Sequence, residues 1–164
     1  PRRIRTSLNA KCVRISDTIS NLDAKDEPFM LLYHCNFGYP LLSEDTEVTV
    51  HGGKITPLGE NSRDPRHMCE PSPDAKEELF LCENADSGTV YNRKLGLGVT
   101  LSFTTGSLPC LVEWKNMMSH EYVVALEPCN TYGMNRETIE RTGKIAVLRA
   151  GDTAVNELVF KITE

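Results

Sequence analysis

Short apolar runs separated by turn residues are the feature of this sequence that most restricts its fold. The runs are rich in β-branched and aromatic residues, and several alternate between apolar and polar positions, which is typical of β-strands. They cover residues 12–15, 29–35, 47–50, 97–103, 122–126, 144–148 and 157–162. Turn-forming clusters that contain glycine stand between them, at 51–53, 86–88, 105–107 and 150–152. The pattern predicts an all-β fold, an antiparallel β-sandwich, with at most a short helical turn near residues 135–141.

The segment 56–76 interrupts this pattern. It holds four of the nine prolines and many charged residues, so we expect a long surface loop without regular structure. Loops of this length in a compact domain are often functional, and this one could pass over a binding site or serve only as a connector.

Composition and charge limit the class of protein. The chain has 164 residues, 40% of them hydrophobic and 25% charged, which suits one domain with its own core. The net charge of −5 argues against a nucleic-acid partner, because phosphate binding depends on clustered Lys and Arg. The short basic cluster at 2–5 is interpreted as a solvated strand end or a fragment boundary. No apolar run is long enough to span a bilayer and the sequence shows no signal-peptide pattern, so we expect no membrane partner.

Six cysteines allow two interpretations besides free thiols. They stand at positions 12, 35, 69, 82, 110 and 129. Three disulfides would suit a secreted chain, but nothing marks secretion, so we expect reduced thiols and a cytoplasmic protein. The sequence His67-Met68-Cys69-Glu70 places three potential metal ligands close together, yet no CxxC motif occurs anywhere. We therefore expect no metal site and no cofactor.

A histidine and a carboxylate stand at the ends of two apolar segments. His34 lies in Leu31-Leu32-Tyr33-His34-Cys35-Asn36-Phe37-Gly38, and Glu127 ends the run Tyr122-Val123-Val124-Ala125-Leu126 before Pro128. An imidazole titrates near neutral pH, and partial burial can raise the basicity of a carboxylate, so the two could form an acid/base pair. Alternatively, His34 is a hydrogen-bonded structural residue and Glu127 ends a strand facing solvent.

The same segments resemble a known group of sugar enzymes. The run from His34 through Asn36, Tyr39 and Pro40 to Leu42 is similar to the histidine motif of the galactose-mutarotase-like sugar epimerases. Residues 108–118, 122–130 and Gly133 are more specifically similar to an uncharacterised branch of that superfamily, whose members are labelled aldose 1-epimerase-like or domain of unknown function. The resemblance runs from about Phe29 to the end of the chain.

This resemblance implies a particular fold and domain organisation. The family forms a large antiparallel β-supersandwich, and its histidine motif lies near the middle of the chain, whereas here it lies at residue 34. The resemblance therefore implies that residues 1–164 are the C-terminal part of a single aldose 1-epimerase-like domain. Such a piece would associate with its missing N-terminal half or form a homo-oligomer.

The resemblance also implies roles for site residues. His34 would protonate the ring oxygen of a sugar, and Glu127 would remove the proton from the anomeric hydroxyl. The substrate-binding residues would be Asn36, Tyr39, Glu77, Trp114 and Lys115. Of these, an indole can stack on a sugar ring and an ammonium group can bind hydroxyls or pair with the carboxylate.

At one position the sequence departs from the related branch. Cys82 stands where that branch has a histidine, and a thiol is a poor replacement for an imidazole as a sugar ligand. This difference places the substrate, and the activity itself, in question.

Three functions are compatible with these observations. The leading one is a carbohydrate-active isomerase that interconverts sugar anomers, as an aldose 1-epimerase (mutarotase) does. The second is a non-catalytic carbohydrate-binding β-sandwich module, and the third is an interaction domain without a ligand. An imidazole and a carboxylate close enough to flank one sugar ring would favour the enzyme.

Overall fold

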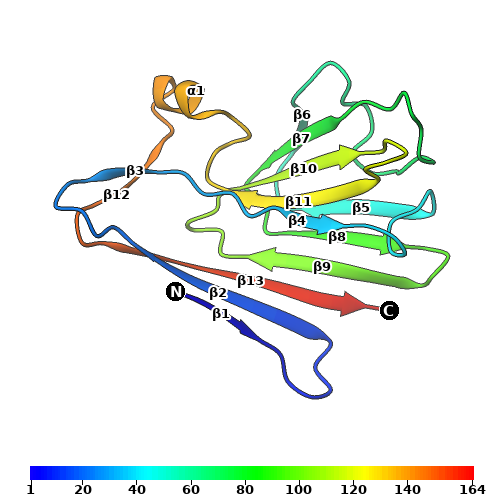
Figure 1. Ribbon diagram of the computed structural model, residues 1–164, viewed down its shortest axis with the longest axis horizontal. Coiled ribbons are helices and arrows are strands. Elements are labelled where there is room, and N and C mark those ends of the chain that lie inside the picture. The colour runs from blue at the N-terminus through cyan, green and yellow to red at the C-terminus, as the bar shows by residue number, and fades with distance from the viewer.

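Two antiparallel β-sheets face each other in a computed structural model that describes all residues from 1 to 164 (Figure 1). The six-stranded sheet has the order β1 (Arg2–Arg5), β2 (Cys12–Ser20), β13 (Thr153–Thr163), β9 (Leu97–Phe103), β8 (Ser87–Asn92) and β5 (Thr46–His51). The five-stranded sheet has the order β4 (Cys35–Phe37), β11 (Val123–Cys129), β10 (Cys110–Asn116), β7 (Glu78–Glu83) and β6 (Ile55–Pro57). The structure confirms the predicted antiparallel β-sandwich.

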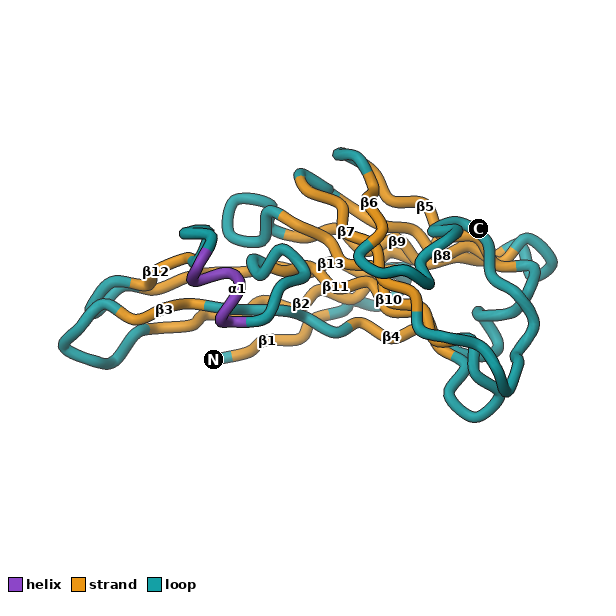
Figure 2. Tube along the Cα trace, turned by 90° about the horizontal axis from the view of Figure 1, so that it is seen from above, coloured by secondary structure: helices purple, strands orange, loops and turns teal.

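A small arm extends from one end of the sandwich. It consists of β3 (Glu27–Phe29) paired with β12 (Ala146–Leu148), and the short helix α1 (Arg136–Arg141) lies beside it (Figure 2). The side chain of Asn135 caps this helix by accepting a hydrogen bond from the Thr138 backbone N–H, at 2.9 Å. The helical turn expected near 135–141 is thus confirmed. No helix in the structure has the length and apolar character needed to cross a membrane.

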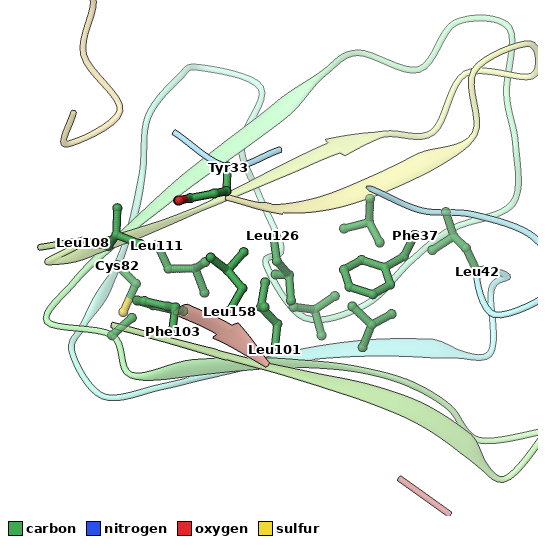
Figure 3. Close-up of a cluster of buried hydrophobic side chains, with 14 of the residues drawn as sticks. Tyr33, Phe37, Leu42, Cys82, Leu101, Phe103, Leu108, Leu111, Leu126 and Leu158 are labelled. Atoms are coloured by element: carbon green, nitrogen blue, oxygen red, sulfur yellow. The ribbon is translucent and has the colours of Figure 1, made fainter. Parts of the chain in front are cut away.

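The core lies between the two sheets. Leu111 and Leu126 reach inward from the five-stranded sheet, and Leu101, Phe103 and Leu158 meet them from the other sheet (Figure 3). Because side chains alternate along a strand, the residues next to these leucines in the chain, such as Val112 and Glu127, face the opposite side. The five-stranded sheet therefore has an inner face toward the core and an outer face, and the site described below lies on the outer face.

Gly88 in β8 packs directly against the facing five-stranded sheet. A Cβ atom at this position would lie 2.9 Å from Leu126 Cδ1 and 3.1 Å from Leu111 Cδ2. These distances are shorter than ordinary van der Waals contact, so only glycine fits here without displacement of the facing leucines.

The predicted strand at 29–35 is wrong as one continuous element. β3 ends at Phe29 and β4 begins only at Cys35. Between them the backbone is held by the Asn130 side chain, which accepts from the Leu31 N–H at 2.7 Å and donates to the Phe29 carbonyl at 3.0 Å. An amide side chain from a distant loop thus takes hydrogen bonds that a strand would give to its neighbour.

The sandwich is open along the free edge of β4. There the six-stranded sheet continues through β13, β2 and β1, and its inner face leaves Ile4, Val13 and Ile162 exposed by 65%, 39% and 44%. Two hollows of about 350 and 370 Å³ lie along this edge, the first lined mostly by apolar side chains. Apolar surface of this kind is normally covered in a folded protein.

We predict that Gly88→Ala destabilises the protein, because the added methyl group would overlap with Leu126 and Leu111. Overpacking of this kind costs about 1–3 kcal/mol. Urea denaturation measures the change, and Gly106→Ala is the matched control, since a Cβ at Gly106 meets no atom within 4 Å. Equal stability of the two variants would contradict the close packing described here.

Candidate functional site

The register of β4 against β11 places His34 opposite Glu127. Cys35 pairs with Leu126 within the ladder, and Leu32 forms an isolated bridge with Cys129. Both pairs have the same register, and the Tyr33 N–H donates to the Pro128 carbonyl between them at 3.0 Å. His34 is therefore the direct cross-strand neighbour of Glu127, and the side chains of such neighbours lie close together.

The two side chains meet on the outer face of the five-stranded sheet. His34 Nε2 lies 2.8 Å from Glu127 Oε1, which is hydrogen-bond distance. The carboxylate is almost buried, with 7% of its side chain exposed, whereas 48% of the imidazole is exposed. The structure thus confirms that the two groups predicted from the sequence converge.

The surroundings of Glu127 favour a bound proton. Burial raises the pKa of this carboxyl, and the positive charge of a protonated His34 opposes that shift. A buried carboxylate is costly unless a cation compensates it, so the pair is most stable when it holds one proton. That proton resides on the imidazole, giving an ion pair, or on the carboxyl, giving a neutral pair.

Two neighbours hold the imidazole in place. The Asn36 side-chain oxygen lies 2.7 Å from His34 Nδ1. Trp114, on β10, approaches the His34 ring edge-on, with ring centroids 5.4 Å apart and an angle of 71° between the planes. Trp114 therefore lines the same face as the pair, as predicted.

Lys115 lies on the other face, so its predicted place beside Trp114 is wrong. Adjacent residues of a strand point to opposite sides, and the Lys115 side chain is buried on the inner face. Its Nζ donates to the carbonyls of Asp64 and His67, at 2.6 and 3.0 Å, and lies 3.4 Å from Glu78 Oε1. The ammonium group thus anchors the loop of residues 58–77, which connects β6 to β7, and is not available to a ligand at His34.

The structure separates two further predicted site residues, and the position of Cys82, from the pair. Tyr39 is 88% exposed and lines a different hollow, together with Asp45 and Lys94. Glu77 is exposed just before β7 and takes no part in the contacts of His34 and Glu127. Cys82 is buried in the core with its pKa raised by burial, so this position faces away from the outer-face site.

Glu113 is a second buried acid, which the sequence motifs did not indicate. It follows Leu111 by two residues on the inner face of β10, and neither carboxylate oxygen has a hydrogen-bond partner. Burial raises the pKa of Glu113 to about 8, and the Lys115 ammonium group only partly opposes this. The sequence did contain a signal for this buried acid, namely an acidic residue at a core-facing position of an apolar strand.

All six cysteines are free thiols. No group of three or more His, Cys, Asp or Glu side chains is arranged as a metal site. The His67 ring nitrogens instead face carboxylates, with Nδ1 at 2.9 Å from Asp64 Oδ2 and Nε2 at 3.5 Å from Glu47 Oε1.

We predict that Glu113→Gln stabilises the protein increasingly as the pH rises. The folded carboxyl has a pKa near 8 against an ordinary value of 4.5, so the folded state binds more protons between these values and its stability falls as the pH rises through them. The glutamine amide does not titrate, so the Glu113→Gln variant avoids this loss of stability. The loss amounts to roughly 1 kcal/mol per pH unit in that window.

Urea denaturation at pH 5, 7 and 8.5 tests this, with the exposed Glu60→Gln as the control. The stability difference between Glu113→Gln and the unaltered protein should widen with pH, and the control should show no such trend. A constant difference would contradict a neutral Glu113 in the folded state.

Comparison with known proteins places this chain in a family. No functionally curated protein matches the chain significantly. Among solved structures, a "putative aldose 1-epimerase" from Klebsiella pneumoniae subsp. pneumoniae MGH 78578 matches with a TM-score of 0.91 at 22% identity, covering 99% of this chain and 46% of that one. A galactose mutarotase related enzyme from Lactobacillus acidophilus matches with a TM-score of 0.69 at 14% identity, covering 99% of this chain and 61% of that one.

A third structure, a galactose mutarotase-like protein from Lactobacillus casei ATCC 334, matches with a TM-score of 0.63 at 19% identity, covering 92% of this chain and 58% of that one. The chain thus spans about half the length of these relatives. At such identities the matches establish the fold, which is the galactose mutarotase-like sandwich. The model of the family described as "Domain of unknown function (DUF4432)" matches residues 1–162, and this chain therefore belongs to the DUF4432 family.

Proposed function

We propose that this chain carries the acid/base pair of a sugar isomerase that interconverts the anomers of an aldose or a related sugar. The observation that supports this most directly is the 2.8 Å contact between His34 Nε2 and Glu127 Oε1. It provides one hydrogen-bond donor and one acceptor side by side at the edge of an exposed face. The names of the mutarotase-like relatives agree with this chemistry.

The pair suits the two oxygens of a cyclic hemiacetal. The ring oxygen and the anomeric hydroxyl oxygen are bonded to the same carbon, so they lie about as close together as the His34 and Glu127 atoms do. The protonated imidazole can donate to the ring oxygen while the carboxylate accepts from the anomeric hydroxyl. Ring opening needs both transfers, and neither requires a covalent intermediate.

The proton balance closes within the pair. As the bond between the anomeric carbon and the ring oxygen breaks, His34 gives up a proton and Glu127 gains one. The anomeric carbon becomes the carbonyl carbon of an open-chain sugar. Rotation of that carbonyl group and the reverse transfers close the ring with the other anomeric configuration, which restores both groups. The direct contact also lets the proton return from carboxyl to imidazole between turnovers.

Trp114 has the position of a sugar platform. Its indole lies on the outer face next to the imidazole, and the side chain is only partly buried. Aromatic faces bind the apolar side of a sugar ring, so Trp114 would orient the substrate above the pair.

One observation favours the alternative, a carbohydrate-binding module without catalysis. The pair lies on an open face, and none of the larger hollows is lined by both Glu127 and Trp114.

Because the chain spans 46% of its Klebsiella relative, we propose that residues 1–164 are the C-terminal part of a longer aldose 1-epimerase-like domain, whose other part completes the cleft.

We predict that the full-length protein accelerates exchange between α- and β-anomers of an aldose, and that His34→Ala or Glu127→Gln each lowers the rate constant by about 100-fold or more. Two-dimensional exchange NMR on glucose and galactose measures the rate. The exposed His120→Ala and Glu60→Gln serve as matched controls and should retain full activity.

The binding-module alternative predicts no faster anomer exchange in that experiment. In a separate titration, sugar would quench or shift the fluorescence of Trp114, the single tryptophan of the chain. Exchange that persists unchanged in both site variants would contradict the assigned roles.

We also predict that the isolated 164-residue chain self-associates through its open edge, unless the remaining part of the domain is supplied. Ile4→Lys should reduce this association, because it places a charge on the exposed inner face of β1. Val155→Lys is the matched control, since Val155 is 60% exposed but faces the other side of the same sheet.

Size-exclusion chromatography with light scattering and binding of an apolar dye report the association. The measurement uses about 100 μM protein, a concentration at which exposed apolar surface leads to aggregation. The proposed division of the domain would be contradicted if the isolated chain stayed monomeric, bound no dye and was fully active.

A further inference from the structure

We propose that Asn36 is a positioning residue, whose side-chain oxygen fixes the His34 imidazole in the form that carries a proton on Nδ1. This inference rests on the proposed acid/base function of His34 and Glu127. The sequence suggested instead that Asn36 binds sugar hydroxyls, but the structure shows its oxygen 2.7 Å from His34 Nδ1.

The backbone brings the three side chains to one face. His34 and Asn36 are two residues apart along the same extended segment, so both point to the outer face. In the β4–β11 ladder Asn36 pairs with Ala125, and Glu127 lies two residues farther along β11. The imidazole therefore lies between an amide on its own strand and a carboxyl on the neighbouring one.

The two contacts together restrict the protons on the ring. A carboxamide oxygen can only accept a hydrogen bond, so Nδ1 must carry a hydrogen to bond with it. Nε2 is then free to share a second proton with Glu127, at 2.8 Å. In this arrangement the pair holds one proton, as the proposed ring opening requires.

The opposite orientation of the amide would have a different consequence. If Asn36 offered its NH₂ group, Nδ1 would accept, and the neutral ring would carry its only hydrogen on Nε2. Glu127 would then be an ionised carboxylate beside a neutral imidazole, although it is almost buried. A buried charge without a compensating cation is costly, so the burial of Glu127 favours the orientation in which Asn36 accepts.

Few other ionisable groups act on the ring. Cys35 follows His34, and burial raises its pKa to about 12, so it remains a neutral thiol. Arg2, on β1, lines the hollow beside His34 but binds Asp17 with two hydrogen bonds, at 2.8 and 2.6 Å. Trp114, from β10, carries no charge. Glu127 and Asn36 thus remain the groups that directly determine the protonation of His34.

The test measures the His34 tautomer directly in the full-length protein. Long-range ¹H–¹⁵N correlation spectra of ¹⁵N-histidine-labelled protein distinguish a protonated Nδ1 from a protonated Nε2. We expect Nδ1 to stay protonated throughout the titration of the ring. In Asn36→Leu, which lacks the acceptor, the neutral ring should instead carry its hydrogen on Nε2.

Kinetics provide the second measurement. Asn36→Leu should lower kcat for anomer exchange by about 10-fold or more with little change in KM, and should move the alkaline limb of the pH–rate profile to lower pH. Asn36→Asp keeps an acceptor and adds a negative charge, so it should retain the tautomer and move that limb to higher pH. Asn61→Leu and Asn61→Asp, in the exposed 58–77 loop, are matched controls that should change neither property.

Two results would overturn the proposal: a neutral His34 protonated on Nε2 in the unaltered protein, or an Asn36→Leu variant whose tautomer and pH profile are unchanged. The spectra do not depend on turnover. If the protein shows no anomer exchange, the proposed function fails while the tautomer of His34 still decides the role of Asn36.

Discussion

The register between β4 and β11 is the constraint on which the site depends. Val124 and Leu126 are fully buried between the sheets, so their side chains cannot leave the inner face without loss of core packing. Their positions force Glu127 to the outer face, and the shared register then places His34 directly opposite it. If the register of β11 shifted by one residue, its side chains would change faces. Glu127 would then point into the core, and Leu126 would point to the outer face where the site lies. The packing of apolar residues thus determines the geometry of the polar pair.

Two buried acids on adjacent strands show how the environment separates structural from chemical roles. Both Glu113 and Glu127 have a raised pKa because burial disfavours the charged carboxylate. Glu113 faces the core and its oxygens have no hydrogen-bond partner, so it is most stable as a neutral acid. Glu127 meets the half-exposed imidazole of His34, which can supply or accept a proton and is accessible to solvent. Only the second arrangement joins a buried acid to a group that solvent reaches.

The polar contacts of the five-stranded sheet are divided between its two faces. On the inner face, Lys115 holds the carbonyls of Asp64 and His67 and thereby fixes a long proline-rich loop to the sheet. On the outer face, Asn36 and Trp114 hold the imidazole from two directions. Both Lys115 and Trp114 come from β10. Because they are adjacent in the strand and point to opposite faces, Lys115 contacts the loop and Trp114 contacts the imidazole.

Local sequence patterns were enough for the antiparallel β class and for the short helix near 135–141, because these depend on periodicity and turn residues. They also named His34 and Glu127 as a pair, and the structure places the two side chains 2.8 Å apart. The sequence did not determine which side chains share a face. The split of the segment 29–35 depends on Asn130, about 100 residues away, and the burial of Lys115 and Cys82 depends on strand register. Register and long-range hydrogen bonds form only when distant strands pack together, so the tertiary structure alone separated Trp114 from Lys115 and joined Asn36 to His34.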